Sequence, residues 1–178
     1  FPDDFKKALA NAAQKIKHEI SKGKNIIIYG DYDADGICAT AILYKVIHDE
    51  LHYDKVFFFI PNRFDNGYGL SLSSIDEINE KYGSSLVVTV DSGITAVAEV
   101  TRLKELGFEV IITDHHQKPD LLPDADFIVW SDAIVGSSVA WFLGKALGST
   151  DSQLVAFAAL ATVTDLQPVL SVNRTILK

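Results

Sequence analysis

In the first part of the chain, apolar residues occur either in short continuous runs, typical of buried strands, or at helical spacing, and the two patterns alternate. Residues 25–29 form a short apolar run with three consecutive isoleucines, which is typical of a strand buried on both faces of a parallel sheet. Residues 2–22 place apolar side chains near helical spacing with lysines between them, which predicts an amphipathic helix. After Gly36, small and apolar residues at helical spacing predict another helix over about residues 37–51.

The alternation continues to residue 130 and then stops. Regular exchange of apolar strands and helices predicts βαβ crossovers, and therefore an α/β fold with a mostly parallel five-stranded sheet and helices on both faces. From about residue 133 the pattern is helical only, which predicts a C-terminal helical segment. The later strands are expected at residues 55–60 and 85–90, both buried, and at 108–113 and 126–130. The later helices are expected at residues 74–82, with Ser73 or Ser74 as the cap, and at 95–106, 135–147 and 152–164. A further helix is expected to start after a cap at Ser171.

Composition narrows the class of protein. The 178 residues suffice for one sizeable core, and 48% hydrophobic with 22% charged residues is typical of a soluble globular domain. No apolar run approaches the ~20 residues of a membrane span. Cys38 is the single cysteine, so we expect a packed thiol, no internal disulfide and a cytoplasmic protein. The net charge of −8 indicates no general nucleic-acid-binding surface. The chain starts at Phe1 and lacks methionine, so we expect it to be part of a longer product.

Three aspartates directly follow the first strand, at the alternate positions Asp31, Asp33 and Asp35. They lie on a strand-to-helix turn at the carboxyl edge of the sheet, where α/β proteins bind their ligands. One aspartate in such a turn is more simply explained as a solvated residue or a helix cap. Three carboxylates within five residues repel one another unless a cation lies among them, and their oxygens suit Mg²⁺ or Mn²⁺. The pattern therefore favours a metal site.

Two further strands end in residues that can bind metals. The third strand is followed by Asp91, and the fourth by Asp114, His115 and His116. Taken singly, Asp91 could cap the helix that follows it, the histidines could be an ordinary turn pair, and Asp165 could be a buried carboxylate with its hydrogen bonds satisfied. Taken together at one edge of a parallel sheet, these residues are the parts of a two-metal hydrolytic site, in which the cations lie ~3.5–4 Å apart.

The loop over residues 61–71 also carries large side chains, Arg63, Phe64 and Tyr68, between its glycines and asparagines. A functional lid and an anchored surface loop explain this composition equally well.

Four segments resemble, in order and spacing, the four motifs of the DHH phosphoesterase superfamily: GDYDADG, VTVDSG, TDHH and ATVTDLQP. Within it the chain is most similar to the RecJ branch, the single-strand-specific 5′→3′ exonucleases. The loop IPNRFDNGYGLS, the run LPDADFIV and the terminal NR pair carry this closer similarity. The resemblance covers residues 26–174, which is nearly the whole chain.

The resemblance implies a role for each matching residue. Asp91 would bridge two Mn²⁺ or Mg²⁺ ions, and His116 would reach the scissile phosphate. Tyr29 stands where several branches of the superfamily carry a histidine ligand. One metal would be held by Asp35, Asp91, His115 and Asp165, and the second by Asp33 and Asp91. Asp31 would be a further ligand or a support, and Asp114 would orient the histidines. Arg63 and Arg174 would contact the substrate.

The implied function is metal-dependent phosphodiester hydrolysis that releases 5′-nucleotides from the 5′ end of single-stranded DNA. Residues 1–178 would be the catalytic domain, with the family's DHH-associated, strand-binding domain outside them. Partners would be single-stranded DNA and repair or replication proteins, with no membrane involved. Two alternatives stay open: hydrolysis of short oligonucleotides, cyclic dinucleotides or polyphosphate, and a non-catalytic scaffold in a replication complex. Activity of the isolated domain is also open.

Overall fold

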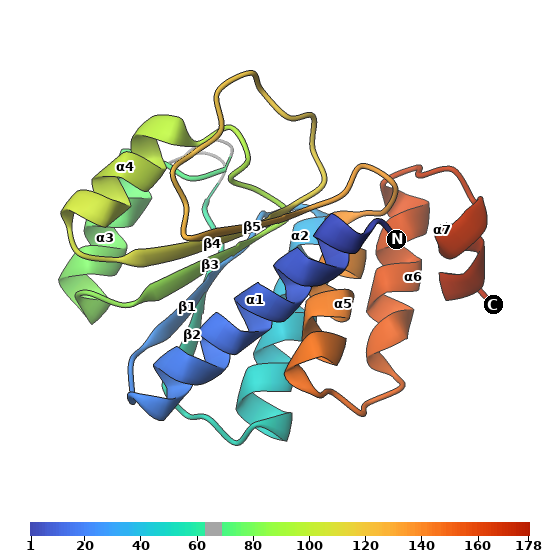
Figure 1. Cartoon of the computed structure of the whole chain (residues 1–178), viewed down its shortest axis with the longest axis horizontal. Coiled ribbons are helices and arrows are strands. Elements are labelled where there is room, and N and C mark those ends of the chain that lie inside the picture. Colours follow the sequence, from blue (N-terminus) through green and yellow to red (C-terminus); the bar gives the residue numbers. More distant parts are fainter. Residues whose placement is uncertain (63–68) are drawn as a thin grey trace.

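The computed structural model describes residues 1–62 and 69–178. Within these residues, five strands form one sheet in which every neighbouring pair is parallel (Figure 1). This confirms the α/β class expected from the alternating pattern. The strands, in the spatial order β2-β1-β3-β4-β5, are β1 (Ile26–Tyr29), β2 (Val56–Phe59), β3 (Leu86–Val90), β4 (Glu109–Asp114) and β5 (Phe127–Trp130).

Helices cover both faces of the sheet, as the pattern predicts (Figure 1). Side chains alternate between the two faces along each strand. On β1, Ile26 and Ile28 therefore enter one core, while Ile27 and Tyr29 enter the other. The first core is covered by α1 (Asp3–Ser21), α2 (Ala34–Lys45), the π-helical turn η1 (Val46–Glu50) and α5 (Gly136–Leu147). The second core is covered by α3 (Leu72–Tyr82) and α4 (Val97–Glu105). Helix α6 (Leu154–Thr164) packs on α2 and α5, and α7 (Ser171–Ile176) packs on α6.

Four sequence-based details were wrong. Strand β2 is only partly buried, because it lies at the edge of the sheet: Val56 is buried, but Phe58 is 55% exposed. Helix α3 is capped by Ser71 rather than Ser73 or Ser74, since its side chain accepts the Ser74 amide and forms a capping box. Helix α7 begins at Ser171, so this residue is helical and not the cap. Helix α2 begins earlier than expected, because Asp33 caps it.

The strand order creates a crevice at the carboxyl edge of the sheet. From β1 the chain first goes to β2 on one side and later to β3 on the other, so β1 and β3 flank the point where the topology reverses. Ligands of open α/β sheets bind outside such a point. Extending the β1–β3 and β3–β4 registers beyond the paired residues places Asp31 beside Asp91, and Asp91 beside Asp114.

Cys38 is buried where α2, α5 and α6 meet, beside Val135 and Ala161, as its position on an apolar helix face predicts. In the described part of the chain, no helix is both long and apolar enough to cross a membrane.

At the opposite, amino end of the sheet, a buried carboxylate ties α1 to β4. Glu19 is fully buried, and its Oε1 accepts hydrogen bonds from the ammonium groups of Lys15 at 3.0 Å and Lys22 at 3.3 Å. Lys15 also donates to Glu109 on β4 at 2.5 Å. Burial acts to raise the pKa of Glu19, but the lysine hydrogen bonds prevail and lower it.

We expect Glu19→Gln to reduce the free energy of unfolding at pH 7 by about 1.5–3 kcal/mol, because it removes charge-assisted hydrogen bonds. A lowered pKa in the folded state means that this stabilisation is present above the ordinary value of 4.5 and is lost as pH falls through the folded value. The variant should therefore lose less stability than the wild type between pH 7 and pH 3. Urea denaturation at both pH values, with exposed Lys17→Gln as control, measures this. An equal loss in both proteins would contradict it.

Candidate metal centre

The three aspartates after β1 occupy three different environments. Asp33 is exposed at the N-cap of α2, where its carboxylate accepts the Gly36 amide at 2.9 Å. Asp31 is buried, and its Oδ2 makes no hydrogen bond to any described residue. Asp35 lies in the first turn of α2, also buried, and faces the start of α5. The alternate spacing therefore gives three kinds of carboxylate: Asp33 caps a helix, Asp31 has one hydrogen-bonded oxygen and one without a hydrogen bond to the described residues, and Asp35 is anchored to the start of α5.

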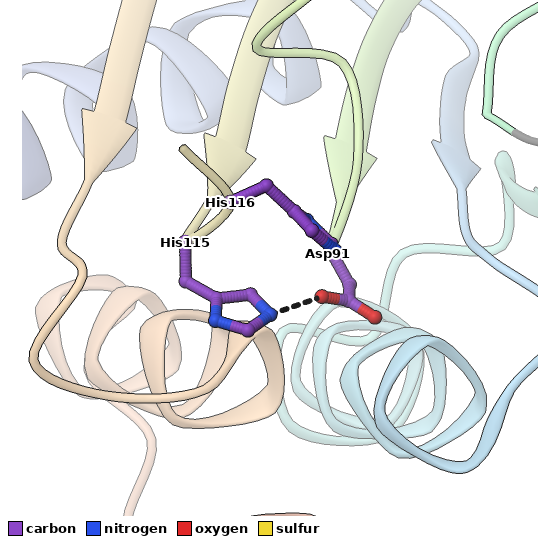
Figure 2. A group of neighbouring side chains, drawn as sticks. All are labelled: Asp91, His115 and His116. Atoms are coloured by element: carbon purple, nitrogen blue, oxygen red, sulfur yellow. Dashed lines mark ion pairs between the residues drawn. The ribbon is translucent and has the colours of Figure 1, made fainter. Parts of the chain in front are cut away.

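Asp91, directly after β3, is buried and has a left-handed backbone with φ 58°. The Nε2 of His115 lies 3.0 Å from its Oδ1 (Figure 2), but neither oxygen has a hydrogen bond of good geometry within the described residues. Burial raises the pKa of Asp91 to about 11, and the charges of Asp35 and Asp33 add to this. The capping alternative is wrong, because α4 begins at Val97 without a side-chain cap. Asp91 is thus a buried carboxyl group whose two oxygens accept no hydrogen bond within the described residues.

The histidine pair is held by its neighbours. Oδ1 of Asp114 accepts the His116 Nδ1 at 2.8 Å and the His115 amide at 2.7 Å, while Oδ2 accepts the Ile94 amide at 2.9 Å. The Trp130 indole donates to the His116 carbonyl at 2.7 Å. The hydrogen bond to Asp114 raises the pKa of His116; burial opposes a low pKa for Asp114, but His116 and Ile94 lower it. The orienting arrangement expected of Asp114 is present.

Asp165 joins the cluster from the C-terminal helical segment. It lies at the end of α6, and its Oδ2 is 4.0 Å from the His115 Nε2. Its side chain is 34% exposed, so the alternative of a buried, satisfied carboxylate is wrong. A hollow of about 80 Å³ next to it is lined by Asp33, Ala34, Asp35, Thr164 and Asp165.

The side chains form three overlapping ligand sets, each with ligand atoms within 4.8 Å of one another. Asp91 belongs to two of them and His115 to two. Carboxylate oxygens and imidazole nitrogens fit Mn²⁺ or Mg²⁺ chemically, and the unpartnered oxygens of Asp31 and Asp91 are donors that a cation would satisfy. The sets are Asp91, His115 and His116; Asp35, His115 and Asp165; and Asp31, Asp33 and Asp91.

Two glycines, a serine and a tryptophan at the site were not anticipated from the sequence. A Cβ on Gly36 would lie 2.5 Å from the Cβ of Asp31, so only glycine fits there. The amides of Gly136 and Ser137 donate to Asp35, which lies 101 and 102 residues earlier in the chain. Gly36 belongs to the first motif and could have been singled out; Gly136, Ser137 and Trp130 carry no local signal.

Three further expectations concern Arg63, Arg174 and Tyr29. Arg63 and the large side chains of its loop lie outside the described residues, so both interpretations of that loop stay predictions. Arg174 is exposed on α7, and its expected contact with substrate stays a prediction. Tyr29 points into the core under α3 and α4, where its hydroxyl donates to the Gly69 carbonyl at 2.9 Å. Tyr29 therefore does not replace a histidine ligand.

Comparison with known proteins identifies the family. The family model described as DHH family, N-terminal domain, matches residues 25–162. The chain belongs to the DHH family. This range of the DHH domain includes the aspartates of the first motif, Asp91 and the histidine pair.

The DHH domain is similar to several RecJ proteins. It is 41% identical to the single-stranded-DNA-specific exonuclease RecJ of Bacillus subtilis, over 99% of this chain and 23% of the relative. Identity to RecJ of Thermus thermophilus is 37%, over 97% of this chain and 27% of the relative. A crystal structure of exonuclease RecJ bound to manganese superposes with a TM-score of 0.86 at 35% identity, over 96% of this chain and 46% of that one. The chain thus spans about a quarter of the length of these curated relatives.

We expect Asp91→Asn to stabilise the metal-free domain at pH 8, because it removes an ionisable group from a buried site beside other carboxylates. A pKa raised in the folded state means that stability is full below the ordinary value of 3.8 and is lost as pH rises toward about 11. The advantage of the variant should grow by about 1 kcal/mol per pH unit between pH 5 and pH 8. Denaturant unfolding in EDTA measures this, with the exposed Asp54→Asn as control. A variant less stable than the wild type at pH 8 would contradict it.

Proposed function

We propose that this DHH domain is the catalytic part of a RecJ-like nuclease, which hydrolyses phosphodiester bonds with two Mn²⁺ or Mg²⁺ ions and releases 5′-nucleotides from the 5′ end of single-stranded DNA. The observation that carries this proposal is the position of Asp91, buried at the reversal point of the sheet and shared by two ligand sets. The activity of the RecJ relatives on single-stranded DNA supports the substrate, and the manganese-bound RecJ structure supports the metal.

Two of the ligand sets support the assignment of the metals, while the third joins Asp91 to His115 and His116. Asp35, Asp91, His115 and Asp165 would hold one ion, and Asp33 and Asp91 the second, with Asp31 as a further ligand or a support. Two divalent cations, when bound, supply charge neutralisation and a water of lowered pKa. These five carboxylates also surround the crevice with negative charge, so a polyanionic substrate needs that neutralisation before it can approach.

His116 is suited to contact the scissile phosphate. Its Nδ1 is committed to Asp114, which assigns Nε2 as the donor to a phosphate oxygen. The raised pKa of His116 favours the protonated, positively charged ring that such a contact requires. Arg63 and Arg174 would bind other phosphates of the DNA strand, because the planar guanidinium group can donate two parallel hydrogen bonds to a phosphate.

The two alternatives are less well supported. A scaffold without catalysis has no use for ligand atoms that gather within 4.8 Å around buried, unpartnered oxygens. Hydrolysis of short oligonucleotides or cyclic dinucleotides uses the same metal chemistry, but the relatives with 37–41% identity are exonucleases of single-stranded DNA. The proposal also includes a role in DNA repair or recombination in the cytoplasm, with repair or replication proteins as partners. A further domain would bind the DNA strand.

Isothermal titration of the chain with Mn²⁺ should reveal two bound ions. Asp91→Ala should weaken both sites by at least about 100-fold, beyond the 10–100-fold seen when a supporting group is lost, because this carboxylate is common to both ions. Asp54→Ala, with 98% of its side chain exposed before β2 at the other end of the sheet, should leave both sites intact. A single site, or two sites that survive Asp91→Ala, would rule out the bridging role.

With Mn²⁺, the protein that carries this domain should release 5′-mononucleotides from single-stranded DNA, and EDTA should abolish the release. His116→Ala should lower the rate about 10²–10³-fold, as expected for a group that stabilises charge on the phosphate. A substrate panel of long single strands, duplexes and dinucleotides decides between the nuclease and the short-substrate alternative. Bound metal without hydrolysis of any of these substrates would favour the scaffold.

A further inference from the structure

The start of α5 is in direct contact with two of the aspartates that would hold the metals. The Gly136 amide donates to Oδ2 of Asp35 at 2.7 Å, and the Ser137 amide donates to Oδ1 at 2.7 Å. Both amides belong to the first turn of the helix, where N–H groups have no partner within the helix. Asp35 therefore lies on the N-terminus of α5, held by both of its carboxylate oxygens.

Gly136 also packs directly against Asp91. A Cβ built on Gly136 would lie 2.5 Å from Oδ1, 2.6 Å from the Cβ and 2.8 Å from the Cα of Asp91. Rotation of the carboxylate cannot relieve the last two contacts, since they involve the Cβ and the main chain. The turn at Asp91 is already left-handed, a conformation that leaves little freedom to move. Any side chain at position 136 must therefore displace either Asp91 or α5.

We propose that Gly136 is a positioning residue of the metal centre. Its amide orients Asp35, and its missing side chain allows Asp91 to approach the same point. The C-terminal helical segment thus acts on the metals through the start of α5 as well as through Asp165. This inference rests on the proposed metal site, because it concerns the geometry of two of the proposed ligands.

Gly136→Ala tests the proposal, with Gly144→Ala as the matched control on the same helix. A Cβ on Gly144 meets only the Cγ2 of Val46 at 3.1 Å and the Cβ of Ser149 at 3.9 Å, far from both aspartates in the packing of α5. Gly136→Ala should weaken Mn²⁺ binding about 10–100-fold, the range typical of groups that support metal ligands, and should alter the EPR spectrum of bound Mn²⁺ at saturation. Gly144→Ala should keep the affinity within about threefold and the wild-type spectrum.

Circular dichroism and the metal-free melting temperature check that each variant folds. If Gly136→Ala does not fold, Ser137→Pro replaces it, since proline is tolerated in a first turn. It removes the amide hydrogen that binds Asp35 and puts a ring carbon in its place, so Asp35 must move away from the helix start. Its partner is Ser137→Ala, which keeps the amide and deletes a hydroxyl that has no hydrogen bond to the described residues. The proline variant should bind Mn²⁺ at least about 10-fold more weakly than the alanine variant.

The outcomes separate the two proposals. A wild-type chain that binds no Mn²⁺ overturns the proposed function, and this inference with it. A wild-type chain that binds Mn²⁺, beside a folded Gly136→Ala with unchanged affinity and spectrum, overturns the positioning role alone. Weaker binding with an altered spectrum in Gly136→Ala, and neither change in Gly144→Ala, supports it.

Discussion

Negative charge concentrated at one point of the sheet is the constraint on which the rest of the structure depends. Asp31, Asp35 and Asp91 are each no more than 3% exposed. Two unit charges 4 Å apart repel by about 4 kcal/mol at an effective dielectric of 20, so a group of this kind is unfavourable without compensation. The protein compensates in part through protonation, which the raised pKa of Asp91 favours, and in part through backbone amides. The remainder is what a divalent cation would supply.

Helix N-termini are the main compensation that the chain itself provides. Asp33 caps α2, and Asp35 receives two amides from α5. The positive end of a helix dipole stabilises a nearby anion by typically 0.3–1 kcal/mol, and by up to ~2 kcal/mol when it is partly buried. Two helices that begin at the site therefore lower the cost of keeping carboxylates there. Their first turns also need glycine, at Gly36 and Gly136, because the aspartates pack directly against the backbone.

The two histidines are held in fixed positions without adding negative charge at the metals. Both oxygens of Asp114 accept hydrogen bonds, from the His116 ring and from backbone amides, so Asp114 supports the histidines. Trp130, on the neighbouring strand β5, holds the His116 carbonyl. His115 is thereby aimed at Asp91 from the adjacent strand end (Figure 2). One edge of a parallel sheet thus carries both the ligands and the groups that keep them in place.

The sequence alone was sufficient for the fold class and most of the site. Apolar runs and helical spacing are local signals, so the five strands, their parallel arrangement and the convergence of Asp31, Asp91 and His115 followed from them. Local signals could not show that β2 is an edge strand with Phe58 exposed, because strand order depends on which crossovers pack together. Nor could they connect Gly136 to Asp35 and Asp91, since that contact exists only once α5 has packed against α2. The sequence therefore determined which groups could hold a metal, and the tertiary packing decided which backbone amides and glycines hold those groups in position.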